Sequence, residues 1–192
     1  MPTTTAGRRM WRLAVLGPVL ALVALATVLV QPAVATQGFC GQTWGSLPKQ
    51  MSNPSASQAV LTNVRSGRHE CFDRLVFELS GPAQGYRVEY VSQVTQDGSG
   101  APVPLRGGAF LQVVLASPAY DANGQPTYRP ADRANVVAVA GYTTFRQVAY
   151  AGSFEGQTTF GVGVRARLPF RVFVLSSPDT TSRVVLDVAH HW

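Results

Sequence analysis

The chain has 192 residues, of which 46% are hydrophobic and 14% are charged, so it can bury the core of an ordinary globular domain. Sixteen basic residues stand against ten acidic ones, a formal net charge of +6, and the basic residues form no cluster. This mild, dispersed charge gives no support to a nucleic-acid-binding protein, which concentrates Lys and Arg on one stripe.

The first 35 residues are expected to direct export of the rest. Three arginines without acidic neighbours precede an apolar run over residues 13–30. Ala33-Val34-Ala35 then has the small-x-small pattern of a signal-peptidase site. A retained membrane anchor is the alternative, because the run approaches the roughly 20 residues that span a bilayer. The Gly17-Pro18 break and the adjacent cleavage pattern favour a signal peptide over residues 1–35, with membrane contact only before cleavage.

The two cysteines, Cys40 and Cys71, lie in the part that is expected to be exported. In an oxidising compartment, an even pair is most simply interpreted as one disulfide. A metal site would need further ligands at suitable spacing, and a catalytic thiol would need an unpaired cysteine beside a base. Residues 36–58 show no periodicity and carry Pro, Ser and Asn, so they are predicted to form an extended arm that the disulfide ties back.

From residue 59 onward the pattern is typical of β-strands. Short runs of β-branched and aromatic residues recur between turn signals, and none of them carries a helical stripe. Residues 85–91 alternate strictly, which places Tyr86, Val88 and Tyr90 on one face and Arg87 and Glu89 on the other. The predicted strands are residues 60–64, 72–79, 85–91, 109–115, 136–139, 143–150, 158–164, 170–175 and 183–188. We therefore expect one all-β domain over residues 59–192, with about eight or nine antiparallel strands in a sandwich or a barrel.

Residues 117–135 interrupt this pattern, because they are too polar and too rich in proline for a core strand. Asn123-Gly124 within them is a turn signal that can close a small hairpin. Without that hairpin the stretch is a mobile loop, and long loops on rigid β scaffolds often carry function.

Two segments, residues 74–79 and 183–188, share the order arginine, three apolar residues, acid, apolar residue. In a strand the arginine and the acid point to the same face but lie roughly 13 Å apart, so they cannot pair within one strand. If the strands pair antiparallel with Arg74 opposite Asp187, then Glu78 falls opposite Arg183. This register predicts two cross-strand ion pairs, each worth well under about 1 kcal/mol if exposed.

The sequence contains no G-x-S-x-G, H-E-x-x-H, P-loop or dinucleotide-binding motif. His69, Glu70 and Asp73 form its densest polar group, and His190 and His191 are adjacent further along. A metal site built from these residues is disfavoured, because adjacent histidines on a strand point to opposite faces. We predict no catalytic residue, no metal and no cofactor. An active site of dispersed carboxylates, or of His69 with Asp73, stays open as an alternative.

Five stretches, in their order along the chain, resemble the AMIN-like domain of exported actinobacterial proteins. They are RHECFDRLVFEL at residues 68–79, GYRVEYV at 85–91, GSFEGQTTFGVG at 152–163, PFRVFVL at 169–175 and RVVLDVAH at 183–190. Each alone is a generic strand, but their order and the H-x-x-x-D-R start at residues 69–74 make the combination fairly specific. The resemblance covers about residues 59–191 and implies a β-sandwich module of the cell envelope.

The related AMIN domain is held to target cell-wall amidases and secretins to peptidoglycan. The resemblance therefore implies an exported, non-enzymatic binding module that recognises peptidoglycan, another cell-wall glycan or an envelope protein. Its candidate binding or ion-pairing residues are His69, Asp73, Arg74, Arg183 and Asp187, and exposed tyrosines could stack on sugar rings. Two alternatives stay open: a small envelope hydrolase, and a sandwich that holds a small apolar ligand between its sheets.

Overall fold

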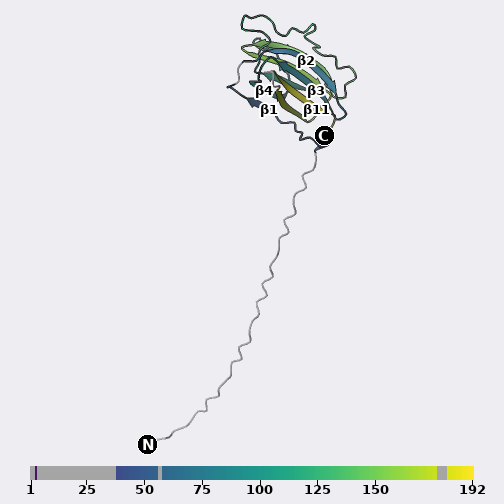
Figure 1. Ribbon diagram of the computed structural model, residues 1–192. Coiled ribbons are helices and arrows are strands. Elements are labelled where there is room, and N and C mark those ends of the chain that lie inside the picture. The colour runs from purple at the N-terminus through teal and green to yellow at the C-terminus, as the bar shows by residue number, and fades with distance from the viewer. Residues whose placement is uncertain (1–2, 4–37, 56–57, 177–180) are drawn as a thin grey trace. The chain divides into compact units, whose positions relative to one another are not determined.

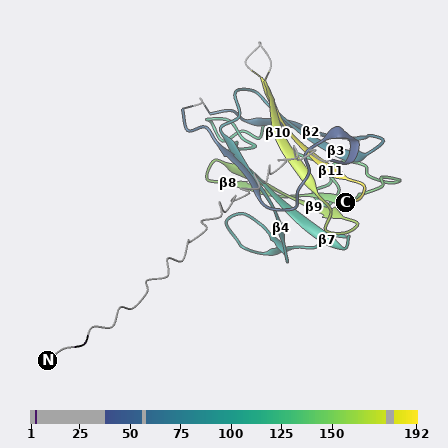
Figure 2. The ribbon, with the colours of Figure 1, turned by 90° about the horizontal axis from the view of Figure 1, so that it is seen from below.

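The structure is a computed structural model that describes residues 3, 38–55, 58–176 and 181–192. Apart from residue 3, the predicted signal peptide at residues 1–35 lies outside the described residues. The strands all fall within one compact unit, Thr36–Trp192. Two antiparallel sheets form the two layers of a β-sandwich (Figure 2), so the predicted all-β sandwich is confirmed.

Four strands form the first layer, in the order β10-β11-β3-β2. Their bounds are β2 Leu61–Arg68, β3 Phe72–Leu79, β10 Phe170–Ser176 and β11 Ser182–Ala189. Strands β3 and β11 are far apart in the sequence but lie side by side (Figure 1). We call this layer the four-stranded sheet; its outer face carries three of the candidate residues.

Five strands form the second layer, in the order β1-β4-β7-β9-β8. Their bounds are β1 Lys49–Ser52, β4 Gly85–Val91, β7 Ala109–Leu115, β8 Phe145–Phe154 and β9 Gln157–Val164. Two short strands, β5 Val94–Thr95 and β6 Pro102–Val103, pair with each other in the connection between β4 and β7. No helix in the described part of the chain is long and apolar enough to cross a membrane.

The core lies between the two sheets, where the alternate positions of each strand point inward. Phe77 of β3 and Phe160 of β9 meet across it with ring centroids 5.0 Å apart, and both are fully buried. Tyr86 and Tyr90 of β4 pack against this core, on the same face as Val88. Their hydroxyl groups donate to carbonyl oxygens of the β10 region, at 3.2 and 2.7 Å, and thereby link the two sheets.

The N-terminal arm contacts both sheets. A short 3-10 turn, Phe39–Gly41, carries Cys40, which forms the predicted disulfide with Cys71 beside β3. Eight residues after this turn, β1 pairs antiparallel with β4 at the edge of the other sheet. The sequence pattern does not predict this strand, because an alternation over only four residues, two of them half-buried, is too short to indicate a β-strand. The arm therefore holds a strand of the sandwich in addition to its covalent tie.

The chain between β7 and β8 differs most from the prediction. The sequence predicts a strand over residues 136–139, but the structure has none there. Instead, residues 133–136 run beside β8 with two isolated hydrogen bonds: the Val136 N–H donates to the Val148 carbonyl, and the Tyr150 N–H donates to the Arg133 carbonyl. Between these two hydrogen bonds, the Gln147 side chain donates to the Ala134 carbonyl at 2.9 Å, where a ladder would use a backbone N–H. Earlier in this connection, Asn123-Gly124 does form a tight turn, closed by the bridge between Tyr120 and Pro126.

Removal of the disulfide should destabilise the domain substantially. The bond joins residues 31 positions apart, and the chain-entropy model assigns about 3–4 kcal/mol to a loop of that length. We expect the free energy of unfolding of the double variant C40S/C71S to fall by that amount in urea titrations. An effect below about 1 kcal/mol would show that the turn and β1 hold the arm without the bond.

Candidate functional site

Arg74, Asp187 and Arg171 form a charged row across three strands of the four-stranded sheet. Arg74 and Arg171 lie directly opposite Asp187 on its two sides, in the register that the repeated sequence pattern predicts for β3 and β11. Arg74 donates to both carboxylate oxygens of Asp187, at 2.7 and 2.9 Å, and Arg171 donates to one of them at 2.8 Å. The Asp187 side chain is fully buried, so this row is a desolvated ion triad and not an exposed pair.

Aromatic rings cover the triad. The Arg171 guanidinium lies 5.4 Å from the Trp44 ring and 5.0 Å from the Phe173 ring, and it also donates to the Gln42 side chain. The Arg74 guanidinium lies 5.1 Å from the Phe72 ring. The hydrogen bonds that Arg74 donates to Asp187 raise the pKa of Arg74 above its ordinary value, which keeps the guanidinium charged. The triad therefore attaches the N-terminal arm to the sheet.

The second predicted ion pair, between Glu78 and Arg183, does not form, although the two residues lie opposite each other on neighbouring strands. The two residues are register partners, yet Glu78 accepts from Arg65 of β2 at 2.7 Å and from Asn63 at 3.1 Å. These hydrogen bonds lower the pKa of Glu78, and Arg183 adds a weaker electrostatic contribution. Arg183 has no close carboxylate partner among the described residues, because Arg65 and Asn63 already occupy its register partner Glu78.

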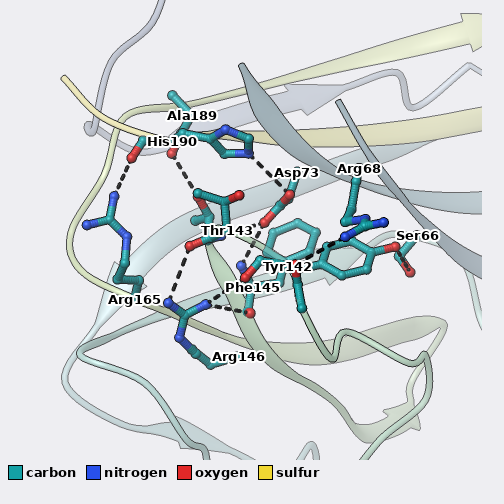
Figure 3. Close-up of polar contacts among 12 residues, drawn as sticks. Ser66, Arg68, Asp73, Tyr142, Thr143, Phe145, Arg146, Arg165, Ala189 and His190 are labelled. Atoms are coloured by element: carbon teal, nitrogen blue, oxygen red, sulfur yellow. Dashed lines mark hydrogen bonds and ion pairs between the residues drawn. The ribbon is translucent and has the colours of Figure 1, made fainter. Parts of the chain in front are cut away.

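Asp73 joins the two sheets instead of pairing with His69. Its fully buried carboxylate accepts the backbone N–H groups of Thr144 and Phe145, at 2.6 and 3.0 Å, where β8 begins. The His190 ring lies 3.2 Å from the other carboxylate oxygen (Figure 3). His69 instead stacks on Phe72, with ring centroids 4.5 Å apart. The sequence does not predict the contact with His190, because 117 residues separate the two.

This Asp–His contact does not have the arrangement of a catalytic couple. The nearby Thr144 hydroxyl donates to the Ala189 carbonyl at 3.1 Å, so it is not directed at the imidazole. Within the residues that the structure describes, no group of three His, Cys, Asp or Glu side chains could hold a metal ion. The contacts of Asp73 instead fix the entry of β8 and stabilise the corner of the sandwich.

The long connection after β7 builds a pocket of about 500 Å³ against the end of β8. We call it the tyrosine pocket, because Tyr120, Tyr128 and Tyr150 line it, together with Arg129 and Arg133. Tyr128 and Tyr150 pack edge to face, 5.9 Å between ring centroids, and both rest on Phe160 of the core. Contact with Phe160 holds the two tyrosine rings in place, and both residues also line the pocket.

The two arginines of the tyrosine pocket carry uncompensated charge. The Arg133 guanidinium lies 5.0 Å from the centre of the Tyr150 ring, and neither arginine has a carboxylate partner in the described part of the chain. The neighbouring acid, Asp132, is occupied by Asn135 and the Ala134 N–H, and these hydrogen bonds lower its pKa. Aromatic rings beside these guanidinium groups suit a ligand that combines a ring able to stack on an aromatic face with an acidic group.

Replacement of Asp187 should test the triad. We expect Asp187→Asn to lower the free energy of unfolding by about 2–4 kcal/mol, because two partly buried guanidinium groups lose their common anion. The matched control is Glu78→Gln on the same face, where the exposed pair with Arg65 is worth under about 1 kcal/mol. Urea titration measures both; equal losses in the two variants would contradict a special role for Asp187.

The Tyr128 hydroxyl should ionise at a higher pH than that of an ordinary tyrosine. Burial raises its pKa to about 12 from an ordinary 10.0, and the neighbouring Tyr150 adds to the shift. Because the unfolded chain ionises more readily, this tyrosine favours the folded state fully below pH 10, and stability falls between pH 10 and 12. The tyrosinate absorbance of Tyr128→Phe should therefore lack the last transition of the wild-type titration. An unchanged titration curve would show that Tyr128 is not the buried group.

The comparisons with known proteins give one family. The protein-family model of the AMIN-like domain matches residues 59–190, which is well over half of the chain. No curated protein and no solved structure matches significantly. The match spans the whole region from just before β2 to the residue after β11, including the triad, the sheet-joining Asp73 and the tyrosine pocket. The chain therefore belongs to the AMIN-like domain family, which is associated with the cell envelope and whose domains generally serve in binding or targeting.

Proposed function

We propose that this protein is an exported, non-enzymatic module that binds cell-wall glycan through the tyrosine pocket. Residues 1–35 act in this proposal as a cleaved signal peptide, and the arm and sandwich work outside the cytoplasmic membrane. The family match supports an envelope role. The proposal adds a ligand class and a place for it on the domain.

The observation that carries the proposal is the combination of packed tyrosine rings with two arginines that have no carboxylate partner among the described residues. Sugar rings stack on aromatic faces, and acidic sugars add a carboxylate that a guanidinium binds in a bidentate manner. The tyrosine pocket offers both within about 500 Å³. The outer face of the four-stranded sheet supports this role less well, because Arg74 and Arg171 already bond Asp187.

An envelope hydrolase is the rival function, and the contact between Asp73 and His190 is where its acid–base pair would lie, although the nearby Thr144 hydroxyl is not directed at the imidazole. Such an enzyme would release soluble fragments from cell-wall material, and Asp73→Asn would abolish the release. Binding without release, retained in the Asp73→Asn variant, supports the module instead.

The test is co-sedimentation of the protein, purified from a secreting host, with cell-wall sacculi across a salt series. We expect binding that persists at high salt and weakens about tenfold in the double variant R129Q/R133Q. The control R65Q/R183Q removes the same charge from the four-stranded sheet and should change binding less than about twofold. Equal losses in the two variants would mean only charge attraction, and an intact R129Q/R133Q would exclude the tyrosine pocket.

A further inference from the structure

A second pocket, of about 510 Å³, lies beside the start of β8. We call it the arginine–valine pocket, after Arg106, Arg146, Val137 and Val139, which line it together with Tyr142 and Phe145. None of the residues that line it is acidic, and it shares no residue with the tyrosine pocket. It is thus a separate cationic site that the proposed glycan binding does not use.

The fold fixes the position of Arg106. Its backbone lies directly on β9 at Gly163, where the Cβ of any other residue would overlap the Arg106 carbonyl oxygen. The Arg106 N–H donates to the Gln147 side chain at 2.8 Å, and its guanidinium donates once to Asn135 at 2.9 Å. An amide orients the guanidinium without neutralising it, so most of its donors are left for a ligand.

Arg146 is oriented by backbone carbonyl groups. Its guanidinium donates to the carbonyl oxygens of Tyr142, Phe145 and Thr143, at 3.1, 3.0 and 3.3 Å (Figure 3). These neutral acceptors hold the planar group in place but leave its positive charge uncompensated. The pocket therefore presents two preorganised guanidinium groups, the arrangement that proteins use to bind a carboxylate.

Apart from Asn135, which binds Arg106, the rest of the wall consists of apolar and aromatic residues. Val137 and Val139 line it, and the Tyr142 ring stacks on Phe145 with centroids 6.0 Å apart. The Tyr142 hydroxyl bonds to Ser66 at 2.9 Å, so the polar end of that ring already has a partner (Figure 3). A ligand that fills this wall gains by burying small apolar groups.

We propose that the arginine–valine pocket binds the free C-terminal carboxylate of a short peptide with small apolar side chains. Arg106 and Arg146 bind the carboxylate, and the valines contact the side chains. Inorganic phosphate matches only the cationic part, because it has no apolar group to bury. The same chemistry exists in the alanine-rich stem peptides of peptidoglycan and at the C-terminus of an envelope protein, and the configuration of the alanine residues distinguishes the two.

Calorimetric titration of the protein from a secreting host tests the proposal. The probes are D-Ala-D-Ala, L-Ala-L-Ala, the C-terminal amide of each dipeptide, and inorganic phosphate. We expect one acid to bind, its amide to bind about tenfold more weakly, and the variant R106Q to lose a similar factor. The variant R129Q/R133Q should bind the dipeptide as wild type does, which keeps this result independent of the glycan proposal. Circular dichroism and the thermal midpoint confirm that each variant is folded.

Each outcome decides the question. Preference for the D-dipeptide supports a cell-wall stem peptide, and preference for the L-dipeptide supports a protein C-terminus. Any of the following results overturns the proposal: amides that bind as well as acids, phosphate that binds as tightly as the dipeptides, a folded R106Q variant with unchanged affinity, or no detectable binding at a dipeptide concentration of about 10 mM. A loss in the charge control R183Q equal to that in R106Q also overturns it, because only net charge would then matter.

Discussion

The buried carboxylate of Asp187 sets the register on which the four-stranded sheet depends. Its partners, Arg74 and Arg171, come from the strands on its two sides, and a slip of one residue in either pairing would turn a charge into the core. The triad also reaches the N-terminal arm through Gln42. One desolvated anion thus links three strands and the arm through directional hydrogen bonds.

The two kinds of arginine in the molecule have different roles because their partners differ. Arg74 and Arg171 on the sheet share one acid, which engages donors of both guanidinium groups. Arg106 and Arg146, like Arg133, are positioned by amides, carbonyls or rings, which leave the charge available. These three guanidinium groups lie on or beside the connection between β7 and β8, where the proposed ligands would bind.

The sequence is a good guide where the pattern is local or repeated. The shared Arg-to-acid spacing predicts that Arg74 lies opposite Asp187, and the alternation in residues 85–91 predicts which side of β4 is buried. It fails where a distant side chain decides the structure. Asp73 meets His190 only after the sheet has closed, and Gln147 replaces a ladder hydrogen bond beside residues 133–136. The proline-rich stretch at 117–135 signals an unusual loop, but its tyrosines form a pocket only against Tyr150 and Phe160.

Both ends of the described sandwich lie at one corner. Cys40 is bonded to Cys71, the His190 N–H donates to the Cys71 carbonyl, and the Phe39 ring packs at a tilt against His191. The loop at Tyr120 and Thr127 instead meets Leu61 and Ser153, at the opposite ends of β2 and β8. One end of the sandwich therefore carries the two ends of its chain, and the other end carries the tyrosine pocket. A linker joined directly before Gly38 or directly after Trp192 would leave from this corner, so it would hold the sandwich with the tyrosine pocket at the far end.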